Sequence, residues 1–248
     1  DLAGSLGAPE VVLSWSDRDE AGPAIPSRFV LRVQAMLGDL AGDHVETRAI
    51  DLARALDRAT VLNVTSHPFF NLEGAASGDA RGHRIAIDAA HYLPVDAQRI
   101  PTGEIAPVAG TPFDLRGGPT LGEALARLPA GSGFDHCYVM GGPEGSSATP
   151  PWRRAARAQA PGSGIVMEVW SDAPGLQFFS ASGFDGSLPR HAGKGGRAYQ
   201  REAGFCLEPQ GLPDAPNQPG FPDATMRPGE PRRGRIEYRF SVADEAAG

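Results

Sequence analysis

Short apolar runs with alternating polar positions recur along the chain, separated by turns rich in glycine and proline. Side chains of a strand alternate between its two faces, so runs of this kind predict β-strands. Many short strands at this spacing predict an all-β fold, in which antiparallel sheets form a sandwich or a barrel. Strands are expected at residues 10–15, 28–37, 44–53, 59–67, 83–89, 164–171, 176–181, 204–208 and 234–242.

Two segments depart from this pattern. Residues 119–128, PTLGEALARL, have the spacing and the residue types of a short helix. Residues 151–160 have a helical composition, but a turn and a strong strand follow them. We therefore expect the first arm of a hairpin there, with its arginines facing solvent. Because no internal repeat and no clear linker occurs, the sequence predicts a single domain over residues 1–248.

The composition is that of an ordinary globular protein, with 41% hydrophobic and 21% charged residues. Lysine and arginine number 23 against 30 aspartates and glutamates, and the basic residues form no long run. This charge pattern argues against a nucleic-acid partner. No apolar run approaches the roughly 18 residues of a membrane span, and no signal peptide is visible at the start. A small, weakly charged partner is the natural expectation.

The chain has two cysteines, Cys137 and Cys206. They are too few for a disulfide scaffold and lack the paired spacing of a zinc site. Free thiols favour a reducing compartment, so we expect a cytoplasmic location.

The first candidate for chemistry is His67, which closes the run VLNVTSH. Alternation places it in a polar row with Asn63 and Thr65. Pro68 biases the residue before it towards extended backbone, so the imidazole should be held stiffly. A structural role is equally compatible with a single histidine.

Two further candidates are carboxylates. In GFDHCYVM, alternation puts Asp135 on one strand face with Cys137, and in FCLE it puts Glu208 on one face with Cys206. Both thiols should therefore lie beside a carboxylate, although a turn aspartate or a strand-end glutamate is an ordinary structural feature. The stretch 209–223, rich in proline, asparagine and aspartate, predicts an ordered loop over a site.

Other kinds of site find less support. The GKGG stretch at 193–196 lacks the strand and the helix that flank a phosphate loop. No HExxH or paired CxxC motif occurs and the six histidines are scattered, so no metal site is expected. Ser66 faces away from His67, which argues against a serine nucleophile. Cleavage of a glycosidic bond by Asp135 and Glu208 stays open, because the sequence does not fix their separation.

Five stretches, taken together and in this order, resemble the aldose 1-epimerase (galactose mutarotase) family. They are NVTSHPFFNLEG, YLPVDAQRIPTGEIAPVAGTPFDLR, GFDHCY, MEVWSDAPGLQFFSA and FCLEPQGLPDAPNQPGFPD. The resemblance covers roughly residues 10–243. It implies a large twisted antiparallel β-sandwich with a sugar cleft on one sheet and no metal or organic cofactor.

The resemblance also implies roles for four residues. His67 would be the acid that protonates the ring oxygen of the sugar, and Glu208 the base that takes the proton of the anomeric hydroxyl. Asp135 and Gln177 would bind sugar hydroxyl groups. The implied reaction interconverts the α and β anomers of an aldohexose, such as galactose or glucose, by opening and closing the ring.

The sequence departs from the family in two ways. The family carries an Asn-Arg-Ile segment and a Leu-His-Gly-Gly segment ahead of the matched region, and neither occurs here. We therefore expect the chain to correspond to the C-terminal two-thirds of a member, with exposed sheet edges that could associate with another chain. In addition, Pro68 and Pro209 each remove an amide donor beside a residue with an implied catalytic role.

Three functions remain open at this point. The first is an active aldose 1-epimerase, favoured because His67 and Glu208 are both present. The second is a non-catalytic carbohydrate-binding relative, favoured by the missing segments. The third is a relative that acts on hexose phosphates, suggested by the cluster Arg232, Arg233 and Arg235.

Overall fold

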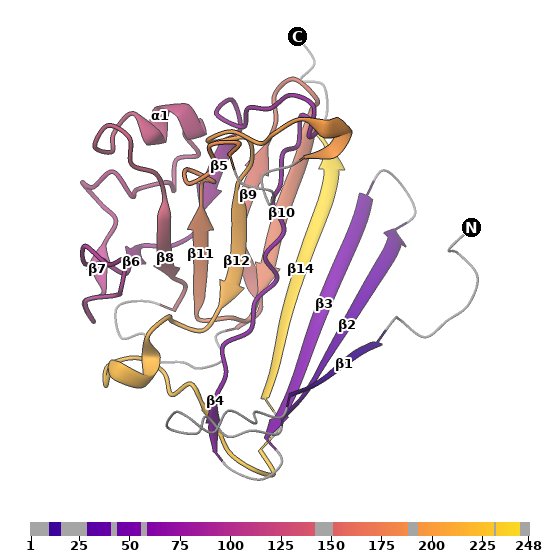
Figure 1. Ribbon diagram of the computed structural model, residues 1–248, viewed down its shortest axis with the longest axis vertical. Helices are drawn as coiled ribbons and strands as arrows, with labels where there is room; N and C mark the ends of the chain where they lie inside the picture. The colour runs from indigo at the N-terminus through magenta and orange to yellow at the C-terminus, as the bar shows by residue number, and fades with distance from the viewer. Residues whose placement is uncertain are drawn as a thin grey trace.

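The computed structural model describes residues 10–15, 29–40, 44–55, 59–141, 151–187, 193–230 and 232–243, the first three ranges as backbone only. Almost all of the regular structure is β-strand, arranged in two main antiparallel sheets (Figure 1). The predicted all-β class and the twisted β-sandwich are confirmed. No helix of the described residues is long and apolar enough to cross a membrane.

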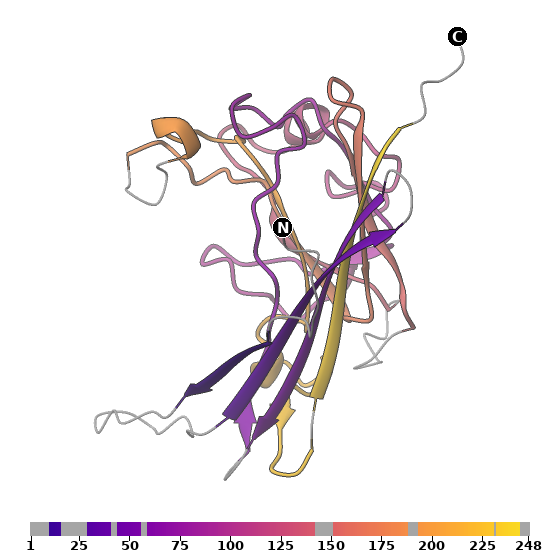
Figure 2. The same ribbon diagram turned by 90° about the vertical axis from the view of Figure 1, so that its right-hand side faces the viewer.

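The larger sheet has seven strands in the order β1-β2-β3-β14-β10-β9-β5. In Figure 2 its long strands β2, β3 and β14 run side by side. Every neighbouring pair is antiparallel. The strands are β1 (Glu10–Trp15), β2 (Phe29–Leu40), β3 (His44–Ala55), β14 (Arg232–Val242), β10 (Ile165–Ser171), β9 (Arg153–Gln159) and β5 (Arg84–Ile87).

The smaller sheet has five strands in the order β12-β11-β8-β6-β7. A separate two-stranded pair joins β4 (Thr60–Val61) to β13 (Thr225–Met226). Short 3₁₀ turns lie at Lys194–Gly196 and Ala215–Asn217. The strands of the smaller sheet are β12 (Cys206–Gln210), β11 (Gly175–Phe179), β8 (Asp135–Val139), β6 (His91–Tyr92) and β7 (Ala106–Pro107).

Both segments that departed from the strand pattern form the predicted type of element, but the arginines at 151–160 are half-buried and not fully in solvent, with Nε and Nη2 of Arg153 buried. The segment at 151–160 forms β9, which pairs with β10 as the first arm of a hairpin. The helix is α1 (Leu121–Leu125), shorter than the predicted range. Thr120 and Glu123 form a capping box, in which each side chain accepts a hydrogen bond from the other's backbone N–H. These two bonds fix the start of a helix that is too short to be stable by itself.

The strand predicted at residues 59–67 is wrong in most of its length, because only Thr60–Val61 is paired as a strand. The rest of the segment passes alongside β12 without a backbone ladder (Figure 1). Pro68 on this segment and Pro209 on β12 have no N–H group, so neither can donate a ladder bond. Backbone pairing resumes at Phe70 and Phe205, which exchange two hydrogen bonds.

The main core lies between the two sheets. The seven-stranded sheet contributes side chains such as Ile85, Met167 and Ile236, and the five-stranded sheet contributes Tyr138 and Phe178. All five are at most 3% exposed. Burial of each such side chain stabilises the fold by about 1.5–3 kcal/mol relative to its exposure to water. The opposite face of the five-stranded sheet is therefore the outer face of the sandwich.

A second, smaller apolar cluster covers one end of that outer face. Leu212 and Phe221, from the loop after β12, pack against Cys137 and Val139 of β8. The loop over the sheet that the sequence predicted is thus present, and it leaves the rest of the outer face open.

Candidate active site

Three neighbouring strands, β8, β11 and β12, present the predicted polar residues on the outer face of the five-stranded sheet. Gln177 lies directly opposite Glu208 on one side and Cys137 on the other. In the next row, Phe179 lies opposite Cys206 and Asp135. The sheet register therefore brings together residues from three distant parts of the sequence.

The predicted alternation on β8 and β12 is confirmed. Phe134, Tyr138 and Leu207 point into the main core, where each is at most 1% exposed. Asp135 and Glu208 point the other way and line the same cleft. Period-two alternation was sufficient to assign these faces because both segments are regular strands.

The polar row before His67 also has a clear partner. Asn63 exchanges two hydrogen bonds with the backbone of Gly211, at 3.0 and 2.8 Å. Thr65 donates a hydrogen bond from its hydroxyl to the carbonyl oxygen of Pro209, at 2.9 Å. Side-chain bonds thus replace the missing backbone ladder and hold this segment beside β12. The polar side chains fix the segment in register.

The end of this row is the pair formed by His67 and Glu208. The Nε2 atom of His67 lies 3.4 Å from Oε1 of Glu208. The imidazole is 52% exposed, whereas the carboxylate side chain is only 5% exposed. The pair therefore joins a solvent-accessible group to a buried one.

The environment of Glu208 makes it a stronger base than an ordinary carboxylate. Burial, and then the charge of Asp135, raise the pKa of Glu208 to about 7. Its Oε1 atom is buried and accepts no hydrogen bond. A raised pKa near neutrality suits a group that takes up and releases a proton.

Asp135 is held from two sides. Gln177 donates from Nε2 to one carboxylate oxygen and Arg99 donates from Nη1 to the other, each at 2.8 Å. The Oε1 atom of Gln177 is buried and has no hydrogen-bond partner among the described residues. This oxygen and the carboxylate of Asp135 are free to meet hydroxyl groups of a ligand.

Arg99 is a residue that the sequence analysis missed. It has a φ of 65°, in the left-handed region that is unusual for a residue with a side chain. The carboxylate of Asp96 supports the turn by accepting hydrogen bonds from the N–H groups of Gln98 and Ile100. An arginine in a turn rich in polar residues gives no sequence signal of its position over Asp135.

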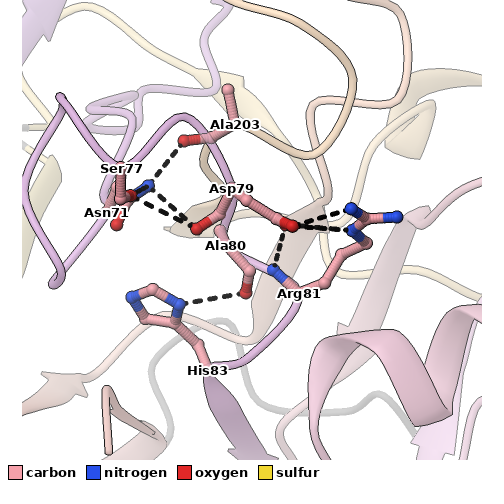
Figure 3. A network of polar contacts seen from close by, with 7 residues as sticks. All are labelled: Asn71, Ser77, Asp79, Ala80, Arg81, His83 and Ala203. Atoms are coloured by element: carbon pink, nitrogen blue, oxygen red, sulfur yellow. Dashed lines mark hydrogen bonds and ion pairs between the residues drawn. The ribbon is translucent and has the colours of Figure 1, made fainter. Parts of the chain in front are cut away.

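The loop that follows His67 is fixed by the side chain of Asn71 (Figure 3). Its Nδ2 donates to the hydroxyl of Ser77 at 2.9 Å and to the carbonyl oxygens of Asp79 and Ala203 at 3.3 and 2.9 Å. The last of these bonds ties the loop to the segment that leads into β12. The segment that carries His67 and the segment that leads to Glu208 are thereby anchored to each other.

His83, in the same network, has a structural role (Figure 3). Its Nε2 accepts the N–H of Leu72 at 2.9 Å, so the proton of the neutral ring sits on Nδ1, which lies 3.0 Å from the carbonyl oxygen of Ala80. Burial lowers the pKa of His83 and favours this neutral form. Both nitrogens are used, which leaves none for catalysis.

The cleft formed by these residues has a volume of about 350 Å³. This is within the range of about 300–1,000 Å³ that is typical of small-molecule sites. Two other cavities, of about 150 and 510 Å³, contain no histidine among their lining residues. The cleft is lined by His67, Leu93, Val95, Arg99, Pro101, Asp135, Cys137, Gln177, Phe179, Glu208, Gln210 and Pro213.

Both cysteines are free and buried. Cys137 lines the cleft, and Cys206 lies beside Glu208, as the alternation predicted. Burial raises the pKa of Cys137 to about 12 and raises that of Cys206 as well. Thiols that keep their protons at neutral pH are poor nucleophiles. Neither is therefore a candidate for covalent catalysis.

The arginine cluster at the start of β14 does not contribute to the cleft. Arg232 donates to the carbonyl oxygens of Asp223 and Thr225. The guanidinium of Arg235 stacks on Trp152, 3.6 Å from the ring centre. These contacts give no support to a phosphate-binding role beside Glu208.

A buried carboxylate and an imidazole, in an open cleft on one face of a β-sandwich, define a class of proteins suited to acid–base chemistry on small polar molecules. The family model of aldose 1-epimerase matches residues 7–239, and the chain belongs to this family. The predicted resemblance is thus confirmed.

Curated relatives agree with this assignment. The chain is 44% identical to a galactose mutarotase of Homo sapiens over 186 residues, which are 75% of this chain and 52% of the relative. It is 33% identical to an aldose 1-epimerase of Escherichia coli over 211 residues, which are 84% of this chain and 57% of the relative. The chain therefore spans about half the length of the curated relatives it matches.

Solved structures show the same fold. An aldose epimerase homologue from C. elegans superposes with a TM-score of 0.79 at 24% identity, over 98% of this chain and 68% of that one. A galactose 1-epimerase from Lactobacillus acidophilus gives a TM-score of 0.72 at 24% identity, over 98% and 65%.

Proposed function

We propose that the chain acts as an aldose 1-epimerase, which interconverts the α and β anomers of an aldohexose such as galactose or glucose. One observation carries this proposal: the imidazole of His67 lies 3.4 Å from the buried carboxylate of Glu208 in an open cleft. Opening a hemiacetal requires a proton to leave the anomeric hydroxyl while another reaches the ring oxygen. Both oxygens are bound to one carbon, so the acid and the base must be close neighbours.

Glu208 is the base in this scheme. Its raised pKa lets it accept the proton of the anomeric hydroxyl near neutral pH. His67, in its protonated form, donates a proton to the ring oxygen as the carbon–oxygen bond breaks. The sugar becomes an open-chain aldehyde, which rotates about its C1–C2 bond. Closure on the other face reverses both proton transfers and restores the two side chains.

The other polar residues of the cleft would orient the sugar. We assign hydroxyl contacts to Asp135 and Gln177, since their oxygens face the cleft with capacity to accept hydrogen bonds. Arg99 would fix the carboxylate of Asp135 and add donors to the rim of the cleft. The names of the curated relatives, galactose mutarotase and aldose 1-epimerase, support the same substrate class.

Two accompanying expectations remain part of the proposal. The free thiols fit a reducing compartment such as the cytoplasm. Among the described strands, β1 and β7 lie at sheet edges, where another chain could associate.

The proposal is tested by polarimetry of freshly dissolved α-galactose and α-glucose with the purified chain. We expect faster mutarotation than in buffer, and a decrease of about 10²- to 10⁴-fold in Glu208→Gln and in His67→Ala. Glu230→Gln is the matched control, because this exposed turn residue undergoes the same chemical change outside the cleft.

Circular dichroism and thermal unfolding establish that each variant is folded. A folded chain that binds galactose by calorimetry but does not accelerate mutarotation would support the non-catalytic alternative. Equal acceleration by the chain and by Glu208→Gln would exclude Glu208 as the base.

A further inference from the structure

Three side chains of different chemistry lie together at the cleft: His67 and Glu208, which line it, and Cys206, which is fully buried beside them. They are here called the HCE cluster. One ligand atom from each, an imidazole nitrogen, a thiol sulfur and a carboxylate oxygen, lies within 4.8 Å of the other two. Among the described residues this is the one group of three such side chains so arranged. No sequence pattern indicates this cluster, because His67 lies far along the chain from Cys206 and Glu208.

The separation between the nitrogen and oxygen ligands of the HCE cluster matches the coordination shell of zinc, and the sulfur lies within 4.8 Å of both. Bonds of about 2.0–2.2 Å at tetrahedral angles place a nitrogen and an oxygen ligand about 3.4 Å apart. Nε2 of His67 and Oε1 of Glu208 are 3.4 Å apart. A zinc ion between these two atoms would therefore need little rearrangement of either side chain.

A second observation points to a ligand at the same place. Glu208 is only 3% exposed, and its buried Oε1 accepts no hydrogen bond although it lines the cleft. Nε2 of His67 lies 3.4 Å away but makes no hydrogen bond to this oxygen. Burial of a carboxylate oxygen without a hydrogen bond is costly, and a cation would relieve that cost. The neighbouring imidazole of His67 is 52% exposed, so one ligand of the cluster is open to solvent.

We propose that the HCE cluster is a binding site for Zn²⁺ and similar thiol-binding divalent cations. Three protein ligands leave a fourth coordination position open towards the cleft, as in zinc sites that also bind water. The sulfur and nitrogen ligands select zinc, cobalt or cadmium over magnesium and calcium, which prefer oxygen. On binding, the Cys206 thiol releases its proton to solvent and the sulfur coordinates the metal.

Zinc at this site acts as an inhibitor. It occupies the lone pair of His67 and the carboxylate oxygen of Glu208, the two groups that move protons in the proposed reaction. Inhibition rests on the proposed function, whereas binding rests on the geometry of the HCE cluster alone.

Binding is tested with Co²⁺ as the probe, because a cobalt–thiolate bond has a charge-transfer absorption in the near ultraviolet. We expect this band to appear with one equivalent of Co²⁺ in the wild-type chain and to disappear on addition of Zn²⁺. Cys206→Ser and Cys206→Ala should lack the band. Cys137→Ser is the matched control and should keep it, because Cys137 is also buried at the cleft but outside the HCE cluster.

Inhibition is tested by polarimetry, with each variant compared to its own rate in a chelator. Removal of a second-shell partner typically weakens metal binding by about 10- to 100-fold, so loss of the sulfur ligand should raise the inhibitory zinc concentration at least tenfold. Cys137→Ser should be inhibited like the wild type, and Mg²⁺ should have no effect on either protein.

A cobalt–thiolate band in folded Cys206→Ser, or no band in the folded wild type, would refute the proposed zinc site. Equal sensitivity of Cys206→Ser and Cys137→Ser to zinc would show that zinc inhibits elsewhere. If the wild-type chain shows the cobalt–thiolate band but does not accelerate mutarotation, the zinc site is supported and only the proposed function is refuted.

Discussion

Acidification should destabilise the fold through His136, which lies directly beneath the cleft on β8. The ring packs against Phe113 with centroids 4.4 Å apart, and its Nδ1 accepts the N–H of Asp135 at 3.2 Å. Burial, with a smaller opposing contribution from the charge of Asp135 and a further lowering by Arg99, depresses the pKa of His136 from 6.5 to about 4.

Whether acid stabilises or destabilises the fold follows from comparing the protonation of His136 in the folded and unfolded chains. Well above pH 6.5 the ring is neutral in both the folded and the unfolded chain, and its contribution to stability is fully present. As the pH falls from 6.5 towards 4, the unfolded chain binds a proton that the folded chain excludes. Between about pH 7.5 and about pH 5 this difference lowers the free energy of unfolding by about 2 kcal/mol. Partial exposure of the ring makes this an upper value.

The assay is urea unfolding followed by tryptophan fluorescence at both pH values, for the wild type and His136→Asn. The asparagine oxygen keeps an acceptor for the N–H of Asp135 but does not titrate in this range. Contributions from other groups, including buried His83, are shared by the two proteins and cancel. The wild type should lose about 2 kcal/mol more than the variant. An equal loss in both would refute the reasoning that burial keeps His136 neutral.

Three further predictions concern packing and the cleft. Gly133→Ala should destabilise the fold by about 1–3 kcal/mol in thermal unfolding, because a Cβ at this position meets the side chain of Ser182. Gly183→Ala is the control and should be neutral, because open space surrounds that position. Asn71→Ala removes the bonds that anchor the loop after His67 and should cost about 1–3 kcal/mol by urea unfolding. Saturating galactose should slow alkylation of Cys137 and Cys206; equal labelling rates would place the bound sugar elsewhere.

Local periodicity in the sequence determined most of the strands and the faces of their side chains. Alternation on regular strands predicted that Asp135 shares a strand face with Cys137, and Cys206 with Glu208. On such strands the direction of each side chain depends only on its immediate neighbours. The family motifs named four of the five residues that we place in the sugar site and missed Arg99. The sequence was misleading at residues 62–67, which form no backbone ladder beside Pro209 of β12, and alternation alone gave no sign of this.

Only the tertiary structure decided which strands are neighbours, and hence what the site contains. The order β12-β11-β8 sets Gln177 beside Glu208, and side-chain bonds to the end of β12 bring His67 within 3.4 Å of the same carboxylate. The guanidinium of Arg99 over Asp135 and the HCE cluster arise in the same way. Such contacts depend on strand register and on loops that cross between distant segments, whereas the sequence pattern records only local preference for one conformation and one face.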